Sequence, residues 1–214
     1  MAFIATGAQL DEYPHIKRMM FRKRKLIFHD MLGWAVDCDG DEERDIYDHP
    51  GTVYVINYQH GDVLGMWRLL PTTGSYMLRD IWPDYADGYL PSKNSAWELS
   101  RFFIDREKVD TQDGFERVAL DMFCTMAEFL TLKGVDEVIM LQDPSITYLS
   151  VQIFGIPHIR TEPRPAGKTN AQVVAFRPSF QRQRLQAAEL FNFPLPSTDA
   201  YDLSGMAAMK IAAE

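Results

Sequence analysis

Eight side chains in the first half of the sequence are of the types that bind and activate a charged substrate. They are Arg24, Phe28, Trp34, Asp45, Asp48, Arg68, Glu98 and Arg101. A carboxylate can attract a cation or accept a proton, and a guanidinium can hold a carboxylate through charge-assisted hydrogen bonds. Aromatic rings offer a stacking surface to a base or a cation. Taken alone, each also has a structural explanation, such as a strand ion pair between Glu98 and Arg101.

Common catalytic and metal-binding motifs are missing from this sequence. The segment Gly167-Lys168-Thr169 resembles the end of a phosphate-binding loop, but the first glycine of that motif would fall at Glu162. The five histidines do not cluster at metal-ligand spacing, so we predict no metal site. Cys38 and Cys124 belong to no paired pattern, and we expect both thiols to be free.

The composition indicates one globular domain over residues 1–214. Hydrophobic residues make up 46% of the chain and charged residues 24%, which argues against a disordered or fibrous protein. A net charge of -8 disfavours broad nucleic-acid binding, because such binding depends on neutralising phosphates with Lys and Arg. The apolar runs are too short to span a membrane, and the first residues lack the features of a secretory signal. We therefore expect a cytoplasmic protein.

The elements that must position the charged residues follow from hydrophobic periodicity. Apolar residues at helical spacing predict an amphipathic helix over residues 13–32, which carries Arg24. Residues 33–51 are rich in acidic side chains, a pattern typical of a mobile surface loop. That predicted loop carries Asp45 and Asp48.

Strands are predicted on either side of a long loop. Residues 52–58 and 63–70 are rich in β-formers and are separated by a short Gly-containing connection, which predicts a hairpin. A further strand is predicted over 97–104. The Gly- and Pro-rich segment 71–95 lies between these strands, and a loop of this length is typically functional or mobile.

The second half of the chain predicts a mixed α/β layer. An apolar stripe ended by Gly134 predicts a long helix over 112–133, followed by a strand over 136–141 and a short helix over 145–154. The remaining predicted elements are strands over 156–161 and 171–176, a helix over 178–190 and a tail of uncertain order after about 190.

The order and spacing of the eight side chains resemble those of the acyl-homoserine lactone synthase family, the autoinducer synthases of bacterial quorum sensing. Three residues separate Arg24 from Phe28, five separate Phe28 from Trp34, ten separate Trp34 from Asp45, and two separate Asp45 from Asp48. Arg68 and the run Glu98-Leu99-Ser100-Arg101-Phe102 follow. The segment Leu70-Pro71-Thr72-Thr73-Gly74-Ser75-Tyr76-Met77-Leu78 is also similar to that family, and the strong match covers residues 24–104.

The resemblance implies a fold and a reaction. The fold would be the GNAT-like acyltransferase fold, a single domain with a twisted mixed β-sheet flanked by helices, whose strands splay to admit an acyl donor. The substrates would be S-adenosylmethionine and the thioester of an acyl carrier protein, or an acyl-CoA. The products would be an N-acyl homoserine lactone and methylthioadenosine, and no separate cofactor is implied.

The same resemblance suggests catalytic roles for the carboxylates. The amine of S-adenosylmethionine must lose a proton before it attacks a thioester, since an α-amine with a pKa of about 8 is largely protonated at neutral pH. Glu98 is the first candidate for the general base, held in place by Arg101, and Asp45 or Asp48 could serve instead. The two aspartates also suit the sulfonium and ammonium charges.

The remaining polar and aromatic residues would bind the substrate. Arg24 or Arg68 could receive its carboxylate, and Phe28 and Trp34 could stack on the adenine or the sulfonium. A backbone N–H near Phe102 or Phe103 would stabilise the thioester oxyanion.

The acyl chain needs an apolar tunnel, for which the sequence offers a set of large apolar side chains. They are Phe102, Phe103, Met122, Met126, Met140 and Leu149. Family members that prefer 3-oxo chains place a threonine on the strand before the short helix. Residues 137–142 contain no threonine, which favours an acyl group unsubstituted at carbon three, although Gln142 could donate a hydrogen bond there.

Two basic surfaces could dock an acidic carrier protein. The first comprises Lys17, Arg18, Arg22, Lys23 and Lys25. The second, where we predict docking, comprises Arg160, Arg164, Lys168, Arg177, Arg182 and Arg184.

Two other functions are compatible with these residues. One is a GNAT-type N-acyltransferase that uses acyl-CoA and another amine, but the expected [QR]xxGx[GA] phosphate turn is missing. The other is a non-catalytic sensor of S-adenosylmethionine or an acyl lactone, which would keep the aromatic residues without needing a base.

Overall fold

The computed structural model describes residues 1–144, 158–167 and 169–178. Its helices are α1 (Gly7–Leu10), α2 (Pro14–Arg24), the π-helical segment η1 (Lys25–Met31), α3 (Met77–Asp80), the 3-10 helix η2 (Pro83–Ala86) and α4 (Gln112–Leu132). Its strands are β1 (Ala2–Thr6), β2 (Cys38–Asp39), β3 (Glu42–Glu43), β4 (Val53–Gln59), β5 (Asp62–Pro71), β6 (Ala96–Ile104), β7 (Glu137–Gln142), β8 (His158–Ile159), β9 (Arg164–Ala166) and β10 (Thr169–Phe176).

The core of the fold is one mixed sheet with the strand order β1-β4-β5-β6-β7-β10-β8, and β9 pairs with β10. All neighbours are antiparallel except β6 and β7, which run parallel. This parallel pair is short: its last partners are Glu98 and Ile139, and both strands continue beyond them. The two strands therefore separate in the middle of the sheet, as we predicted for an acyl-donor site.

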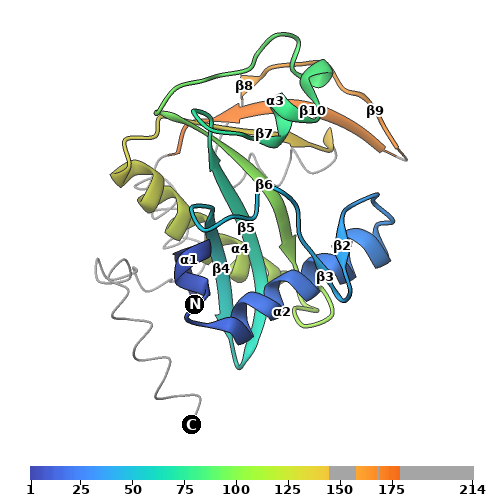
Figure 1. The fold of residues 1–214 in the computed structure, drawn as a ribbon, viewed down its shortest axis with the longest axis vertical. Coiled ribbons are helices and arrows are strands. Elements are labelled where there is room, and N and C mark those ends of the chain that lie inside the picture. The colour runs from blue at the N-terminus through green and yellow to red at the C-terminus, as the bar shows by residue number, and fades with distance from the viewer. Residues whose placement is uncertain (145–157, 168, 179–214) are drawn as a thin grey trace.

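Helices cover both faces of this sheet. Figure 1 shows α2 crossing in front of β4 and β5, with α4 behind them. Successive side chains of a strand are directed to opposite faces of the sheet. Val55 and Leu69 pack in the hydrophobic cluster with α4, whereas Ile56 packs in the cluster with α2. The predicted mixed sheet flanked by helices is confirmed.

The first predicted helix forms as α2 and continues as the π-helical segment η1. The buried positions of α2 are Ile16, Met20, Phe21 and Arg24, which recur at the spacing of one helical face. Arg24 therefore lies at the end of a buried stripe, directed toward the sheet.

The predicted hairpin and long helix are also confirmed. β4 and β5 pair antiparallel through a turn in which His60 and Gly61 both have positive φ angles, 52° and 80°. The helix α4 ends at Leu132, and Gly134 follows with a φ of 70°. The strand predicted over 97–104 is present as β6, and the one over 136–141 as β7.

The prediction of a mobile surface loop over residues 33–51 is wrong for its second half. The short strands β2 and β3 pair here, and Glu43 is completely buried. Tyr47 is also buried, and the Asp48 side chain is only 1% exposed. The acids turn inward because arginines distant in sequence supply their counter-charges, which local composition does not show.

The long segment 71–95 is packed against the sheet through several of its side chains. It contains α3 and η2, and Tyr76, Met77 and Leu78 are buried. Several other predictions lie outside the described residues: the helices over 145–154 and 178–190, the tail after 190, and Leu149, Lys168, Arg182 and Arg184. In the described part of the chain, no helix is long and apolar enough to cross a bilayer.

Candidate active site

Three arginines and three acids form one ion-pair network on the α2 side of the sheet. The arginines come from α2, β5 and β6, and the acids come from β3 and the turn that follows it. They are Arg24, Arg68, Arg101, Glu43, Asp45 and Asp48. The structure thus brings together most of the predicted charged residues, although they are spread over 78 positions of sequence, from 24 to 101.

Arg24 is fully buried, and its guanidinium nitrogens all contact carboxylates. Its Nε donates to Glu43 at 2.5 Å, and its two Nη atoms donate to the two oxygens of Asp48 at 2.7 and 2.9 Å. Burial alone would lower the pKa of Arg24, but Asp48 and Glu43 more than reverse this, so the pKa is raised. These bonds occupy three of the five N–H groups of Arg24.

Arg68 is equally buried and also fully engaged. It binds Asp45 in a bidentate geometry, with N–O distances of 2.5 and 2.9 Å, and its Nη1 also donates to Asp48 at 3.0 Å. Its Nε donates to Ser100 Oγ at 3.1 Å. In this arrangement both Arg24 and Arg68 are paired with carboxylates of the protein, and the expectation that one of them receives the substrate carboxylate stays a prediction.

Arg101 pairs with Glu43 and Asp45 and makes no contact with Glu98. Its Nη2 lies 3.0 Å from both Glu43 and Asp45. The prediction that Arg101 holds Glu98 is therefore wrong. Glu43, which bridges Arg24 and Arg101, was missed by sequence reasoning. One sequence feature points to Glu43: it precedes Asp45 by two positions, and side chains two positions apart in an extended segment lie on the same face.

A β-bulge in β6 explains the direction of Arg101. The register with β5 shifts between Met66 and Arg68, so that Trp67 faces both Arg101 and Phe102. Arg101 itself has a φ of 57°, in the left-handed region that costs a non-glycine residue about 1–2 kcal/mol. The bulge breaks the alternation of the strand, so Arg101 and Ser100 both reach the network.

Glu98 lies next to this network in a different environment. It is 2% exposed, and its two oxygens accept hydrogen bonds from the backbone N–H groups of Met77 and Leu78 at 2.9 and 2.7 Å. Burial raises the pKa of Glu98 to about 7, because these two hydrogen bonds only partly offset the loss of solvent. A carboxyl with this pKa can exchange a proton near neutral pH.

Asp48 has the opposite character. Burial would raise its pKa, but Arg24 and Arg68 hold the pKa well below its usual range. Tyr54 also donates its hydroxyl to Asp48 at 2.9 Å. Such a stabilised carboxylate is a weak proton acceptor, so the geometry favours Glu98 over Asp48 as the base.

The two predicted aromatic residues stack on each other at the edge of the network. Phe28 is buried and Trp34 is 49% exposed, and their ring centroids lie 5.1 Å apart with an interplanar angle of 14°. Arg101 lies over the Phe28 ring at 5.7 Å. An exposed indole beside a charged cluster is a suitable surface for a planar or cationic ligand.

The residues predicted to line the acyl tunnel divide between two faces of the sheet. Met122, Met126 and Met140 belong to the cluster on the α4 side, and Phe102 packs there with its ring 4.6 Å from that of Trp67. Phe103 lies on the α2 side, edge-on to Phe28. Phe102 and Phe103 therefore pack on opposite faces of the sheet, and the acyl-tunnel role predicted for these residues stays a prediction. Gln142 is buried at the end of β7.

The described residues of the second basic surface are partly neutralised. Arg160 Nη2 lies 2.7 Å from Glu137, and Arg164 forms an ion pair with Asp87. Arg177 is exposed and has no ion pair with any other described residue. This surface therefore offers less free positive charge than its sequence indicates.

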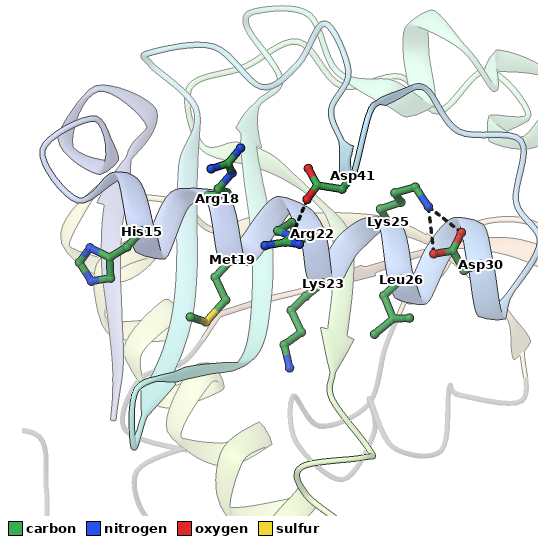
Figure 2. Close-up of a pocket in the computed structure, with 9 residues that line it drawn as sticks. All are labelled: His15, Arg18, Met19, Arg22, Lys23, Lys25, Leu26, Asp30 and Asp41. Carbon is green, nitrogen blue, oxygen red and sulfur yellow. Dashed lines mark hydrogen bonds and ion pairs between the residues drawn. The ribbon is translucent and has the colours of Figure 1, made fainter.

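The first basic surface contains an open pocket of about 520 Å³. Figure 2 shows it on the outer side of α2 and η1, with Arg22 directed toward Asp41 and Lys25 toward Asp30. It lies on exposed side chains of α2, whereas Arg24 is directed into the protein. Among the described residues, no group of His, Cys, Asp or Glu side chains is arranged to hold a metal ion.

Comparison with known proteins gives consistent matches in sequence and in fold. The family model described as autoinducer synthase matches residues 9–184. An acyl-homoserine-lactone synthase of Rhizobium etli is 30% identical over 149 residues, which are 68% of this chain and 70% of that protein. One of Aeromonas hydrophila is 30% identical over 135 residues, or 61% of this chain. That match spans 65% of the Aeromonas protein, slightly less than two thirds of its length.

The fold is similar to that of a solved enzyme. The structure of BjaI, a CoA-dependent acyl-homoserine lactone synthase with S-adenosylmethionine and isopentyl-CoA, aligns with a TM-score of 0.80 at 21% identity. The alignment covers 96% of this chain and 99% of that chain.

Proposed function

Because this chain belongs to the autoinducer synthase family, we propose that it is an acyl-homoserine lactone synthase. Its fold is the GNAT-like acyltransferase fold. The observation that carries the proposal is a buried carboxyl, Glu98, with a pKa of about 7 at the point where β6 and β7 separate. An ion-pair network and an exposed aromatic surface lie beside it.

The first chemical step would be acyl transfer to the amine of S-adenosylmethionine. Glu98 accepts a proton from the ammonium group, directly or through water, and the freed amine attacks the thioester carbonyl carbon. A C–N bond forms, the C–S bond breaks, and the leaving thiolate takes up the second proton that the nitrogen loses when it becomes an amide. Beyond Glu98, the side of β6 that is directed toward β7 makes no strand pairing with the described residues. A backbone N–H of β6 near Phe102 is therefore available to stabilise the oxyanion.

The second step would close the lactone ring. A carboxylate oxygen of the acylated intermediate attacks its own γ-carbon, a C–O bond forms, and the bond from that carbon to sulfur breaks. The electron pair stays on sulfur, so methylthioadenosine leaves as a neutral molecule. The sulfonium is already an activated leaving group, and this step needs mainly positioning. No electrons are transferred to an acceptor, so S-adenosylmethionine is a substrate and the reaction balances without a further cofactor.

The acyl donor would approach between the separated strands. Met122, Met126, Met140 and Phe102 on the α4 side are the residues we propose to contact its chain. The absence of threonine in β7 favours an acyl group without an oxygen at carbon three. We propose that an acyl carrier protein, if it is the donor, docks on the surface around Arg160, Arg164 and Arg177. We propose that the protein acts in the cytoplasm.

The test is mass spectrometry of the purified protein incubated with S-adenosylmethionine and a panel of acyl carrier protein and acyl-CoA thioesters. We expect an N-acyl homoserine lactone and methylthioadenosine in equal amounts, and the productive thioester identifies the donor. Binding of S-adenosylmethionine without either product across the panel would instead support the sensor function. Absence of binding would overturn the proposed site.

A further inference from the structure

The short helix α3 is capped at its beginning by a residue of the sheet. Tyr76, which precedes the helix, makes no capping hydrogen bond with its side chain. The backbone N–H groups of Met77 and Leu78 instead donate to the two carboxylate oxygens of Glu98, at 2.9 and 2.7 Å. Glu98 thus satisfies N–H groups that a helix leaves unpaired in its first turn. The orientation of the proposed base and the position of α3 therefore depend on each other.

Tyr76 attaches the beginning of α3 to the other end of the segment 71–95. Its side chain is completely buried, and its hydroxyl donates to the backbone carbonyl of Pro91 at 2.8 Å. Its own backbone carbonyl accepts a hydrogen bond from the N–H of Asp80 at 3.1 Å, which closes the turn of α3. The guanidinium of Arg79 lies 4.8 Å from the centre of its ring. Tyr76 is therefore fixed through both its side chain and its backbone, immediately before the two N–H donors.

The same segment is attached to the protein at two further places. The Thr72 hydroxyl lies 3.1 Å from the carbonyl oxygen of Lys93 and 2.9 Å from that of Ala96. In η2, the hydroxyl of Tyr85 donates to the backbone carbonyl of Pro165 at 2.6 Å. Loss of the Tyr76 hydroxyl would therefore loosen the beginning of α3 while these other attachments remain.

The charged and titratable groups around Glu98 come from several elements. Burial has the largest effect on its pKa and raises it, and the two N–H groups of α3 oppose burial more strongly than the charge of Arg68 does. Asp80 has a smaller, raising effect. Tyr47 and Tyr76 also face this carboxyl, and burial, with smaller contributions from Glu98 and Asp80, raises the pKa of both hydroxyls. Longer hydrogen bonds from α3 would thus raise the pKa of Glu98 further.

We propose that Tyr76 is a positioning residue for the proposed base: its hydrogen bond to the Pro91 carbonyl holds the beginning of α3, so that the two N–H groups of that helix fix the carboxylate of Glu98. The inference rests on the proposed function, because it concerns the residue that would accept the proton. Tyr76 acts only through the backbone of α3 and contacts no reacting atom.

Tyr76→Phe tests this role, because it removes the hydroxyl and keeps the buried ring. Tyr85→Phe is the matched control, since it deletes the same kind of bond, from a tyrosine hydroxyl to a proline carbonyl, elsewhere in the segment. NMR with carbon-13-labelled glutamate follows the titration of the Glu98 carboxyl, whose signal is identified by its loss in Glu98→Gln. Steady-state rates of lactone formation from about pH 5.5 to 9 follow the same titration during turnover.

We expect Tyr76→Phe to move the midpoint of the Glu98 titration upward by about 0.5 to 1 pH unit. The rate at pH 6 should then fall about three- to tenfold, whereas the rate at pH 9 should stay within about twofold, because Glu98 is ionised there in both proteins. Tyr85→Phe should leave the midpoint and both rates unchanged. An unchanged midpoint in Tyr76→Phe, a uniform loss of rate at every pH, or equal shifts in the two variants would overturn the inference.

Hydrogen–deuterium exchange provides a second measurement, which applies even if Tyr76→Phe does not fold. In the unsubstituted protein, the amides of Met77 and Leu78 should exchange at least about 100-fold more slowly than those of exposed loops, because they are bonded to a buried carboxyl. Exchange as fast as in an exposed loop would overturn the inference. Failure of the proposed function looks different: Tyr76→Phe would still shift the NMR titration of Glu98, but the unsubstituted protein would form no lactone.

Discussion

At the scale of single residues, neighbouring carboxylates of one cluster have pKa values that move in opposite directions. Arg24 and Arg101 lower the pKa of Glu43 against the effect of its burial, and arginines do the same for Asp48. Glu98 has backbone N–H donors instead of a direct arginine partner, and burial raises its pKa. The same chemical group therefore has a lowered pKa at two positions and a pKa of about 7 at the third, where we propose that it accepts a proton.

The first prediction concerns Glu98→Gln. Turnover to lactone should fall about 10²- to 10⁴-fold, the usual contribution of a general base, while binding of S-adenosylmethionine should stay within a few-fold. In the unsubstituted enzyme the rate should increase as pH rises through about 7, because Glu98 must lose its proton before it can accept one from the substrate. Steady-state rates between pH 5.5 and 8 measure this.

The Glu98→Gln variant is also the control for the pH profile of the unsubstituted protein. The inflection near pH 7 should disappear in the residual activity of the variant, and its melting temperature should show that the fold is retained. An inflection that persists in Glu98→Gln would assign the titration to another group.

At the scale of elements, the segment between η1 and β4 depends on charges supplied by the elements around it. Arg24 comes from α2, Arg68 from β5 and Arg101 from the bulge in β6. These arginines fix Glu43 and Asp48 in the interior, although both belong to a strongly acidic stretch. The segment is therefore ordered by ion pairs, because few of its side chains are large and apolar.

The second prediction compares two Asp→Asn changes in this segment. Asp48→Asn should lower the free energy of unfolding by about 3–5 kcal/mol, because it leaves Arg24 and Arg68 with less counter-charge in a buried site. Asp39→Asn makes the same chemical change at an exposed position and should alter stability by less than about 0.5 kcal/mol. Urea unfolding followed by fluorescence measures both. Similar effects of the two changes would show that the network does not order the segment.

At the scale of the whole molecule, the chain is acidic, and so is the carrier protein that we propose as one possible acyl donor. Global charge opposes that approach, so docking must rely on a local surface with uncompensated cations. Arg160 and Arg164 are paired with Glu137 and Asp87, which leaves Arg177 as the free cation of this surface within the described residues.

The third prediction is therefore made for Arg177→Glu. The KM for an acyl carrier protein thioester should rise about three- to tenfold, whereas the KM for an acyl-CoA with the same acyl group should not change, because acyl-CoA lacks the protein surface. The increase in the KM for the carrier protein thioester should become smaller at high ionic strength, because salt screens the charges. Arg22→Glu on the outer side of α2 is the matched control, and a larger effect there would place docking on the first basic surface.

Most of the elements, and most of the residue types in the site, can be predicted from the amino-acid sequence alone. Helical periodicity located α2 and α4, alternation and the His60-Gly61 turn located the β4–β5 hairpin, and the spacing from Arg24 to Arg101 indicated the family. The helices and the hairpin depend on neighbours within a few positions of the chain, which is why periodicity reveals them. The family pattern is a set of residue types at fixed separations along the sequence, so it too can be read without the structure.

Which charges pair with one another depends on the assembled fold. Arg101 pairs with Glu43, 58 positions away, and not with Glu98, three positions away. Two features cause this: the sheet order brings α2, β5 and β6 to one face, and the bulge turns Arg101 toward the network. Burial is also a property of the assembled fold, so the same acidic composition that predicts a mobile loop instead yields a dry ion-pair network. The raised pKa of Glu98 arises likewise from desolvation, which no local pattern encodes.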